Sequence, residues 1–346
     1  MKIYEGHSLL SHNTFAVEAT AVYFIEVESE EDARTLSRDE YFRTLPFIAI
    51  GGGSNLLFQG DFKGAVLHYA PQRVTTLEED DQKVRLFVEG GKEWHALVME
   101  VSRRGLWGIE NLALIPGECG PAAVQNIGAY GREIKDVLRS IRYVDLRSGE
   151  THILPAGEAG YRYRHSIFKE PEMAHALVTG IEIELSKAFS PEISYKGLSG
   201  LRDKEELTPL DVAEEVIRIR RDKLPDPADY PNAGSFFMNP FVSKETFEAL
   251  ASEYPEAPHF IGEDGRVKVP AAWLIQTAGL KGYREGKVGT YPRQPLVIVN
   301  YGGATAKEIA DFSAFVQEGV KEKFGIEIKP EVRFVRSGAQ HSIQEL

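Results

Sequence analysis

The segment that most constrains this chain lies near its centre and is rich in glycine, "IPGECGPAAVQNIGAYG" (115–131). It holds four glycines and two prolines, and its only side-chain amides are Gln125 and Asn126. A loop with so much polar backbone is costly to bury unless its N–H and C=O groups find partners. A pyrophosphate or the edge of a flavin would supply such partners, so this segment predicts a ligand-contacting loop.

A second glycine-rich segment follows a predicted strand, because "PFIAI" (46–50) runs directly into "GGGSNLLF" (51–58). Consecutive glycines allow positive φ angles and can turn successive N–H groups inward, which forms a nest for an anion. The segment is no P-loop, since no Gly-Lys-Ser/Thr follows, and it lacks the GxGxxG pattern of dinucleotide-binding folds. A glycine triplet alone is more often a tight turn, but the presence of a second glycine-rich segment at 115–131 favours a binding role.

Composition and charge exclude several classes of protein. The 346 residues suffice for two or three domains, and a formal net charge of −12 disfavours a general nucleic-acid binder. Basic side chains nevertheless cluster at 162–169, 218–223 and 281–287, which suits a small anionic ligand. The single cysteine, Cys119, excludes an internal disulfide framework and favours a reducing cytoplasm. No apolar run is long enough for a membrane span, and without HExxH or CxxC patterns we expect no metal site.

Apolar periodicity and capping signals predict both strands and helices. Strands are expected at 22–27, 46–50, 65–69, 84–90, 139–150 (where a turn follows), 176–185 and 326–335. Helices are expected after a capping box at 29–32, over 93–104, from a capping box at 208–211 to Leu224, and from a capping box at 305–308 to Gly325. This mixture predicts an α+β protein whose two halves meet near residues 200–225.

Two further segments carry candidate chemistry. As a strand, "YRYRHSIFK" (161–169) would place its tyrosines on one face and Arg162 and Arg164 on the other, but an ordinary exposed sheet surface explains it equally well. The segment "PNAGSFFMNP" (231–240) holds Ser235 between a glycine and two phenylalanines. No GxSxG elbow surrounds this serine, so a nucleophile is disfavoured, and alone the segment indicates a capped turn.

Taken together, these blocks resemble the UDP-N-acetylenolpyruvoylglucosamine reductase family, in its longer variant with a mobile tyrosine loop. The resemblance runs in order over nearly the whole chain, through "SHNTF" (11–15), "IGGGSNLLF" (50–58), "GIENLALIPG" (108–117), "QNIGAYG" (125–131), "YRYRHSIFK" (161–169), "KLPDP" (223–227), "NAGSFFMNP" (232–240), "AAWLIQTAGLKG" (271–282) and "KPEVRF" (329–334). It implies two FAD-binding subdomains of the vanillyl-alcohol-oxidase/PCMH type plus a C-terminal α+β substrate-binding domain. The implied divisions are 1–70, 71–207, 208–325 and a C-terminal strand and tail at 326–346, with the final strand near 326–336 rejoining the first subdomain.

The resemblance also implies an activity. NADPH would reduce FAD, and the flavin would pass hydride to the enolpyruvyl group of UDP-N-acetylglucosamine-enolpyruvate, giving UDP-N-acetylmuramate for peptidoglycan synthesis. Ser235 would protonate the α-carbon, while Arg164 and Glu331 would stabilise the enol. FAD would be the cofactor and NADPH the co-substrate, and the protein would be a cytoplasmic monomer without nucleic-acid or membrane partners.

The remaining implied roles fall into two sets. The FAD contacts are Gly51, Gly52, Gly53, Ser54, Asn55, Ile115, Pro116, Gly117, Gly120, Gln125, Asn126, Gly128 and Arg220. The substrate contacts are Tyr130, Tyr195, Lys223, Asn239, Lys281, Gln294 and Arg333. Tyr195 lies in "FSPEISYKGLSGLR" (189–202) and is expected to close over the substrate diphosphate.

Four positions depart from the family pattern: Glu118, Pro121, Ala123 and Met238. Glu118 places a carboxylate beside the expected pyrophosphate, so it should either point to solvent or weaken FAD binding, while Pro121 and Ala123 suggest a reshaped turn. Met238 replaces a frequent lysine. Two alternatives stay open: an FAD-dependent oxidase of the same fold acting on an alcohol or sugar, and a non-catalytic nucleotide-sugar or flavin sensor. NADPH consumption would distinguish the reductase from the oxidase. A sensor has no reason to keep Ser235, Arg164 and Glu331 together.

Overall fold

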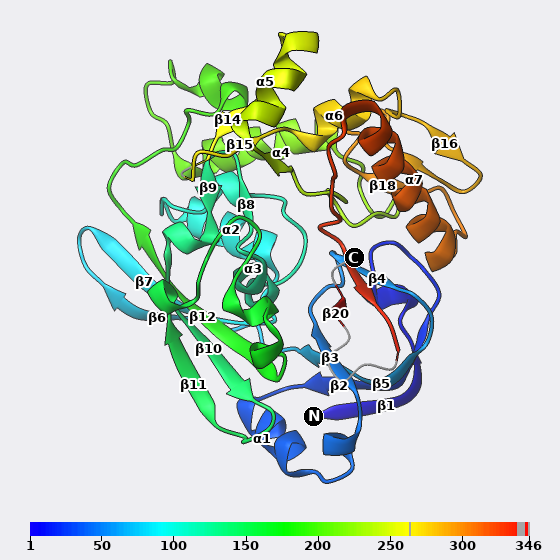
Figure 1. Ribbon diagram of the computed structural model, residues 1–346. Coiled ribbons are helices and arrows are strands. Elements are labelled where there is room, and N and C mark those ends of the chain that lie inside the picture. Colours follow the sequence, from blue (N-terminus) through cyan, green and yellow to red (C-terminus); the bar gives the residue numbers. More distant parts are fainter. Residues whose placement is uncertain (263, 338–342, 345–346) are drawn as a thin grey trace.

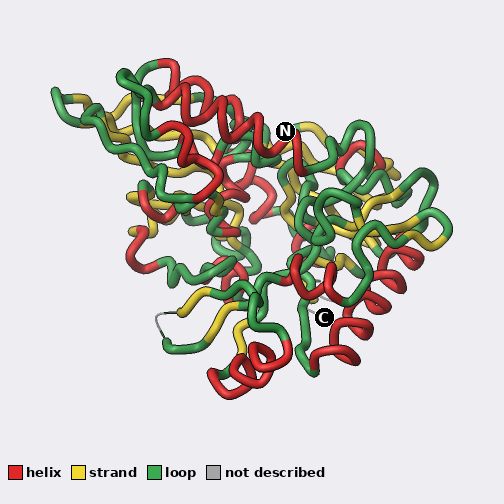
Figure 2. The backbone as a smooth tube through the Cα atoms, turned by 90° about the horizontal axis from the view of Figure 1, so that it is seen from above, coloured by secondary structure: helices red, strands yellow, loops and turns green. Residues whose placement is uncertain are grey.

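The computed structural model describes residues 1–262, 264–337 and 343–344, and it is an α+β protein, as expected. Two sheets occupy the lower part of Figure 1, and the C-terminal helices lie above them. Seen from above, the strands fall into separate groups and loops make up much of the chain (Figure 2). No described helix is both long and apolar enough to cross a bilayer. The same described residues contain no cluster of three or more potential metal ligands.

The first sheet positions the glycine triplet. Its strands lie in the order β1 (Lys2–Ser8), β2 (Thr20–Val27), β5 (Phe62–Tyr69) and β3 (Phe47–Ile50). Pairing of β1 with β2 is antiparallel, whereas β2 and β3 both run parallel to β5. The predicted strands at 22–27, 46–50 and 65–69 are therefore confirmed. Because β3 ends at Ile50, the three glycines begin where the sheet stops.

Helix α1 (Glu30–Arg38) begins at the predicted cap. The Ser29 hydroxyl accepts a hydrogen bond from the Asp32 amide at 3.1 Å. The Asp32 carboxylate does not return to the Ser29 amide as in a full capping box, but accepts from the Glu28 amide at 2.9 Å. The cap is confirmed, and the reciprocal bond is displaced by one residue.

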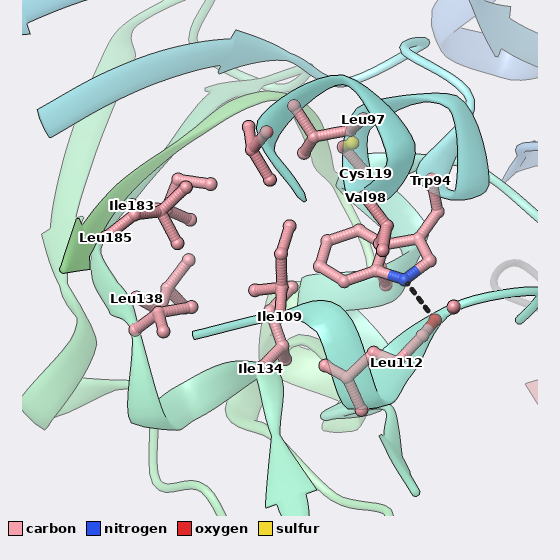
Figure 3. Close-up of a cluster of buried hydrophobic side chains, with 14 of the residues drawn as sticks. Trp94, Leu97, Val98, Ile109, Leu112, Cys119, Ile134, Leu138, Ile183 and Leu185 are labelled. Atoms are coloured by element: carbon pink, nitrogen blue, oxygen red, sulfur yellow. Dashed lines mark hydrogen bonds between the residues drawn. The ribbon is translucent and has the colours of Figure 1, made fainter. Parts of the chain in front are cut away.

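The second sheet is antiparallel and carries the core of the middle segment. Its order is β11 (Thr151–Pro155), β10 (Leu138–Asp145), β12 (Ala176–Ser186), β7 (Lys83–Glu89) and β6 (Val74–Glu79). Helix α2 (Trp94–Arg103) packs here, and Figure 3 shows Trp94 among aliphatic side chains of the sheet and neighbouring turns. Trp94 is 0% exposed and its indole Nε1 donates to the Leu112 carbonyl at 3.0 Å, so its polar atom is satisfied within the core.

Helix α4 (Pro209–Lys223) starts with the predicted capping box, in which the Thr208 and Asp211 side chains each accept a backbone N–H. Its buried side chains Val212, Val216 and Ile219 join the same apolar cluster as Trp94. A division at residue 208 stays a prediction, since this first helix of the expected substrate domain packs on the core of the preceding segment. The packing holds the last turn of α4 in a fixed place.

The C-terminal part combines small sheets with three helices. The sheets are β13 (Phe241–Val242), β15 (Val267–Lys268) and β14 (Phe260–Ile261), and β16 (Arg284–Glu285), β17 (Val288–Thr290) and β18 (Ile298–Asn300). The helices are α5 (Lys244–Glu253), α6 (Ala271–Thr277) and α7 (Ala306–Phe324). Helix α7 has the predicted Thr305/Glu308 capping box and ends at Gly325, whose φ of 65° provides the left-handed cap.

The end of the chain returns to the first part of the structure. Strand β19 (Arg333–Val335) pairs in parallel with β4 (Leu56–Phe58), which follows the glycine triplet after Ser54 and Asn55, and it pairs antiparallel with the short β20 (Ile343–Gln344). The prediction of one strand over 326–335 is wrong in extent, because Pro330 has no N–H for a ladder and only the last three of those residues pair as a strand. Glu331 consequently lies just before the strand rather than on it.

Two other predictions are wrong. Segment 161–169 forms a tight turn in which Arg162 and His165 exchange both backbone hydrogen bonds, followed by a 3-10 turn at Ile167–Lys169. Segment 115–131 is not a continuous loop, since helix α3 (Cys119–Gln125) and the short strand β8 (Gly128–Ala129) lie within it. Pro121 is therefore not in a reshaped turn but in the first turn of a helix, where its missing N–H costs little.

Candidate active site

One cavity of about 690 Å³ gathers most of the residues singled out by the sequence. Both glycine-rich segments line it, and so do Ser235, Arg164 and Glu331. These groups come from the first sheet, the middle segment, the serine loop and the returning C-terminus, so no single stretch of chain makes the site. The volume lies within the range of sites that enclose a small organic ligand.

The glycine triplet forms a wall of this cavity, and at position 53 only glycine fits. Gly53 has a φ of 64°, and a Cβ atom there would lie 1.9 Å from the His12 carbonyl oxygen. The Thr14 amide donates to the Gly53 carbonyl at 3.2 Å, and the Ser54 hydroxyl donates to the Pro116 carbonyl at 3.3 Å. The first bond ties the triplet to the segment before β2, and the second joins the two glycine-rich segments at the cavity edge.

Some residues of segment 115–131 line the cavity, and others form hydrogen bonds that support its wall. Ile115, Pro116, Gly117, Gln125 and Gly128 line the cavity, whereas Gly120 and Asn126 are not among the lining residues. The amide of Gly120 donates to the Gly90 carbonyl at 2.8 Å, and Asn126 Nδ2 donates to the Glu133 carboxylate and the Arg162 carbonyl, both at 3.0 Å.

Arg164 and Glu331 meet at the cavity although they are far apart in sequence. Arg164 Nε lies 2.8 Å from Glu331 Oε1, and Arg164 Nη2 donates to the Gly128 carbonyl at 2.9 Å. Arg164 has a φ of 55°, and Lys169 Nζ donates to its carbonyl at 2.7 Å, so the turn is held from both sides. A left-handed arginine is strained, and the surrounding hydrogen bonds hold it in that conformation.

The Glu331 carboxyl is enclosed. Burial raises its pKa, and the nearby guanidinium of Arg164 opposes that rise only in part. Its backbone is fixed as well, since the Glu331 amide donates to the Phe236 carbonyl at 2.7 Å and Asn55 Nδ2 donates to the Glu331 carbonyl at 3.2 Å. Asn55 thereby links the glycine segment to the carboxyl-bearing residue.

Ser235 is held by its neighbours rather than by its own side chain. Asn232 Oδ1 accepts the Gly234 amide at 2.8 Å, and Phe236 and Phe237 are both buried. The Phe236 amide donates to the Leu296 carbonyl at 2.7 Å. Ser235 therefore sits on an anchored loop at the cavity, adjoining the residue that fixes Glu331. Among the described residues, no hydrogen-bond partner is recorded for its hydroxyl.

Two polar atoms at the cavity have no partner in the described part of the chain: Arg220 Nε on the last turns of α4, and Gln125 Oε1 at the end of α3. Burial lowers the pKa of the Arg220 guanidinium, the direction expected for a cation removed from water. Buried polar groups are normally satisfied, and an unpaired buried arginine is expensive. The cavity therefore calls for a ligand that offers acceptors to Arg220 and a donor to Gln125.

Most of the expected substrate residues lie outside this cavity. Arg333 lines it, but Tyr130, Tyr195, Lys223, Asn239, Lys281 and Gln294 do not. Tyr130 and Tyr195 meet edge to face at 5.1 Å between ring centroids, and Asn111 Nδ2 donates to the carbonyls of Tyr130 and Glu192, both at 2.8 Å. The tyrosine loop is thus docked against the turn that follows β8.

Sequence reasoning missed several residues at this site. Outside the cavity lining, the Tyr163 ring contacts the Arg164 guanidinium; Lys268 Nζ lies 5.1 Å from the centre of this ring, and Asn239 Nδ2 donates to the Tyr163 hydroxyl at 3.4 Å. Alternation in the short strand around Lys268 was too brief to place that lysine. Tyr69, Phe168, Lys169 and His175 line the cavity; Phe168 and Lys169 belong to the candidate segment 161–169, but nothing in the local sequence marks Tyr69 and His175 as lining residues.

Comparison with known proteins agrees with this geometry. Residues 21–154 match the model of an FAD-binding domain, so fold and site together define an FAD-binding oxidoreductase. Residues 226–335 match the C-terminal domain of UDP-N-acetylenolpyruvoylglucosamine reductase. The chain belongs to the UDP-N-acetylenolpyruvoylglucosamine reductase family, and FAD is its cofactor.

Curated relatives span almost the entire chain. The reductase of Porphyromonas gingivalis is 41% identical, with 97% of this chain and 100% of the relative covered. That of Bacteroides fragilis is 43% identical, with 96% and 99% covered. A solved structure of the enzyme from Thermus caldophilus covers 96% of this chain and 98% of its own, at 24% identity and a TM-score of 0.67, which supports the fold alone.

Proposed function

We propose that the protein reduces the enolpyruvyl group of UDP-N-acetylglucosamine-enolpyruvate with electrons from NADPH, giving UDP-N-acetylmuramate for peptidoglycan synthesis. The observation that carries this proposal is the convergence of Ser235, Arg164 and Glu331 in the cavity lined by both glycine-rich segments. We further propose that the protein acts in the cytoplasm as a monomer, without nucleic-acid or membrane partners.

The cavity residues fit FAD. Gly51, Gly52, Gly53, Ser54 and Asn55 would hold the pyrophosphate; Ile115, Pro116, Gly117, Gln125 and Gly128 would contact the flavin side, with Gly120 and Asn126 supporting that wall. Arg220 Nε and Gln125 Oε1, which have no partner among the described residues, offer one donor and one acceptor to a heterocycle with both kinds of group. When bound, FAD supplies the two-electron carrier that links NADPH to the enolpyruvyl carbon.

Arg164 and Glu331 would stabilise the reduced substrate before it is protonated. Reduction of the enolpyruvyl β-carbon leaves negative charge on the α-carbon, and this charge spreads into the adjoining carboxylate. A guanidinium placed beside that carboxylate lowers the energy of the enol form. The raised pKa of Glu331 makes its carboxyl easier to protonate than an ordinary glutamate, and in the protonated form it would donate a hydrogen bond to the same oxygen atoms.

Ser235 would complete the reaction by protonating the α-carbon. A hydroxyl is a weak acid in water, but a carbanion-like carbon is a strong base, so the transfer runs downhill. The serine loop is anchored at both ends, which keeps the hydroxyl at one place on the cavity wall. Its side chain makes no recorded bond within the described residues, so no internal hydrogen bond has to be broken first.

Substrate would be held beyond the cavity by the polar residues around it. We propose Tyr130, Tyr195, Lys223, Asn239, Lys281, Gln294 and Arg333 as its contacts. Lysine and tyrosine groups suit a diphosphate, because it offers charge and acceptors without requiring flat bidentate geometry. The docked position of Tyr195 supports a role in shielding the reduction from water.

A two-step assay tests the proposal. The purified protein should carry oxidised flavin, NADPH should reduce that flavin under anaerobic conditions, and the enolpyruvyl sugar nucleotide should then reoxidise it. An oxidase of the same fold would be reduced by an alcohol or sugar and not by NADPH. A sensor would bind flavin or sugar nucleotide and show neither step, and either result would overturn the proposal.

Replacing Arg220 by methionine should weaken FAD binding without lowering the stability of the folded protein. A charge-assisted hydrogen bond contributes about 1.5–3 kcal/mol, so the FAD dissociation constant should rise by about 10- to 100-fold. The flavin-free protein should be as stable as the parent or more so, since an unpaired buried cation is removed. Flavin fluorescence and thermal unfolding measure the two effects. The control is Arg221→Met, because Arg221 is exposed on the same turn; equal losses in both variants would contradict the assignment.

A further inference from the structure

Glu118 places a carboxylate against the glycine triplet. It lines the cavity, and its Oε2 would lie 2.9 Å from a Cβ atom placed on Gly51. The Pro121 ring stands on the same side, 2.7 Å from that position. A nest of N–H groups suits an anion, so a carboxylate at its mouth opposes the FAD pyrophosphate unless the carboxylate charge is balanced.

His68 supplies that balance. Its Nε2 lies 2.9 Å from Glu118 Oε1, and the two side chains are only 21% and 15% exposed. Glu118 therefore does not point to solvent, the first of the two expectations drawn from the sequence. It also does not cap its own helix: it occupies the N-cap position of α3 without a side-chain cap bond and reaches across to β5 instead.

The pair has few charged neighbours that could replace this partnership. On the His68 side, His12 and Glu26 interact electrostatically with the His68 ring without a hydrogen bond to it. The Nε2 atoms of His12 and His7 lie 3.1 Å apart. Behind Glu118, Lys92 is paired with Glu100 at 3.0 Å, and the Glu93 carboxylate caps α2. In the described residues, the only recorded side-chain partner of Glu118 is thus His68.

We infer that Glu118 and His68 form a proton-dependent element of the FAD site, in which the protonated pair admits the pyrophosphate and the deprotonated pair repels it. This inference rests on the FAD-binding function of the chain. With His68 protonated, the pair is neutral and the nest keeps its attraction for phosphate oxygens. With His68 neutral, Glu118 leaves one negative charge against Gly51, and FAD is held less tightly.

The sign of the expected pH dependence follows from the same contacts. The hydrogen bond to Glu118 raises the pKa of His68, and burial opposes this rise. The proton is therefore bound at low pH and is lost as the pH rises through the raised pKa. A bound diphosphate favours the protonated pair further, so by linkage FAD affinity should fall as the pH increases.

The test measures FAD release from the full-length holoenzyme at several pH values. On dilution, the fluorescence of free flavin gives the FAD dissociation constant. This constant should rise on the order of tenfold from about pH 6 to about pH 9, because His68 loses its one positive charge beside Glu118 over that range. Glu118→Gln should bind FAD more tightly than the parent at high pH and lose most of the slope. His68→Gln should bind FAD weakly across the range, also with little slope.

A matched control is His152→Gln, because His152 lies on β11, outside the cavity lining, and should leave the slope intact. Thermal unfolding of each variant with and without added FAD separates weak binding from a damaged fold. Weaker binding by Glu118→Gln at high pH, or an unchanged slope in both pair variants, would overturn the inference. Absence of flavin from the parent would overturn the FAD-binding function as well, so the two failures are distinguishable.

Discussion

Replacing Ser235 by alanine should lower the rate at which substrate reoxidises the reduced enzyme by about 10²- to 10⁴-fold, the usual contribution of a positioned acid. The variant loses the hydroxyl at the cavity wall, while the anchored loop and the buried Phe236 stay in place. Reduction of the flavin by NADPH should keep its parental rate, since no proton is delivered to carbon in that step. Stopped-flow absorbance of the flavin measures both half-reactions separately.

The control for this prediction is Ser313→Ala. Ser313 lies on α7, and its hydroxyl donates to the Ala310 carbonyl of the same helix at 2.8 Å. This variant should keep both half-reactions. Ser235→Ala reoxidised by substrate at the parental rate would remove Ser235 from the mechanism, and loss of flavin reduction as well would indicate damage to the fold rather than loss of an acid.

Removing Arg164 should affect turnover and stability together. Arg164→Met takes away the cation that we propose for the substrate carboxylate, for which a loss of about 10²- to 10³-fold in turnover is expected. It also leaves Glu331 enclosed without its guanidinium, and breaking such a pair costs about 3–5 kcal/mol. Steady-state kinetics and urea unfolding of the flavin-free protein measure the two effects.

The double variant Arg164→Met with Glu331→Gln separates these contributions. Without the enclosed carboxylate, most of the stability should return, while the turnover should stay low. If the double variant is as unstable as Arg164→Met, then the unpaired Glu331 is not the cause. Arg162→Met serves as the matched single control, because Arg162 is exposed in the same turn.

Glu331 also gives this pair a pH signature. Its pKa is raised by burial in the folded protein, so the folded state binds the proton more tightly than the unfolded chain. The corresponding stability is present below the unfolded pKa and is lost as the pH rises through the folded pKa. Glu331→Gln should therefore reduce the dependence of the unfolding free energy on pH over that range.

Local pattern was enough to predict much of the fold. Burial alternates along strand β12 except at Gly180, and α7 shows both its capping box and its terminal glycine in the sequence, so both were predicted correctly. Segment 161–169 also alternates, yet it folds as a turn because a hydrogen-bond exchange between Arg162 and His165 and a left-handed Arg164 replace the strand ladder. Periodicity cannot anticipate a turn that contacts from distant segments hold in place.

The sequence by itself determined which stretches can bend back on themselves and which residues bring chemistry, because φ preferences, caps and apolar periods depend on neighbours along the chain. Only the tertiary structure decided that Arg164 meets Glu331, that Glu118 turns to His68, and that Arg220 Nε faces a cavity without a partner among the described residues. These are contacts between segments far apart in the chain. They depend on how sheets and helices pack, and packing is a property of the whole fold.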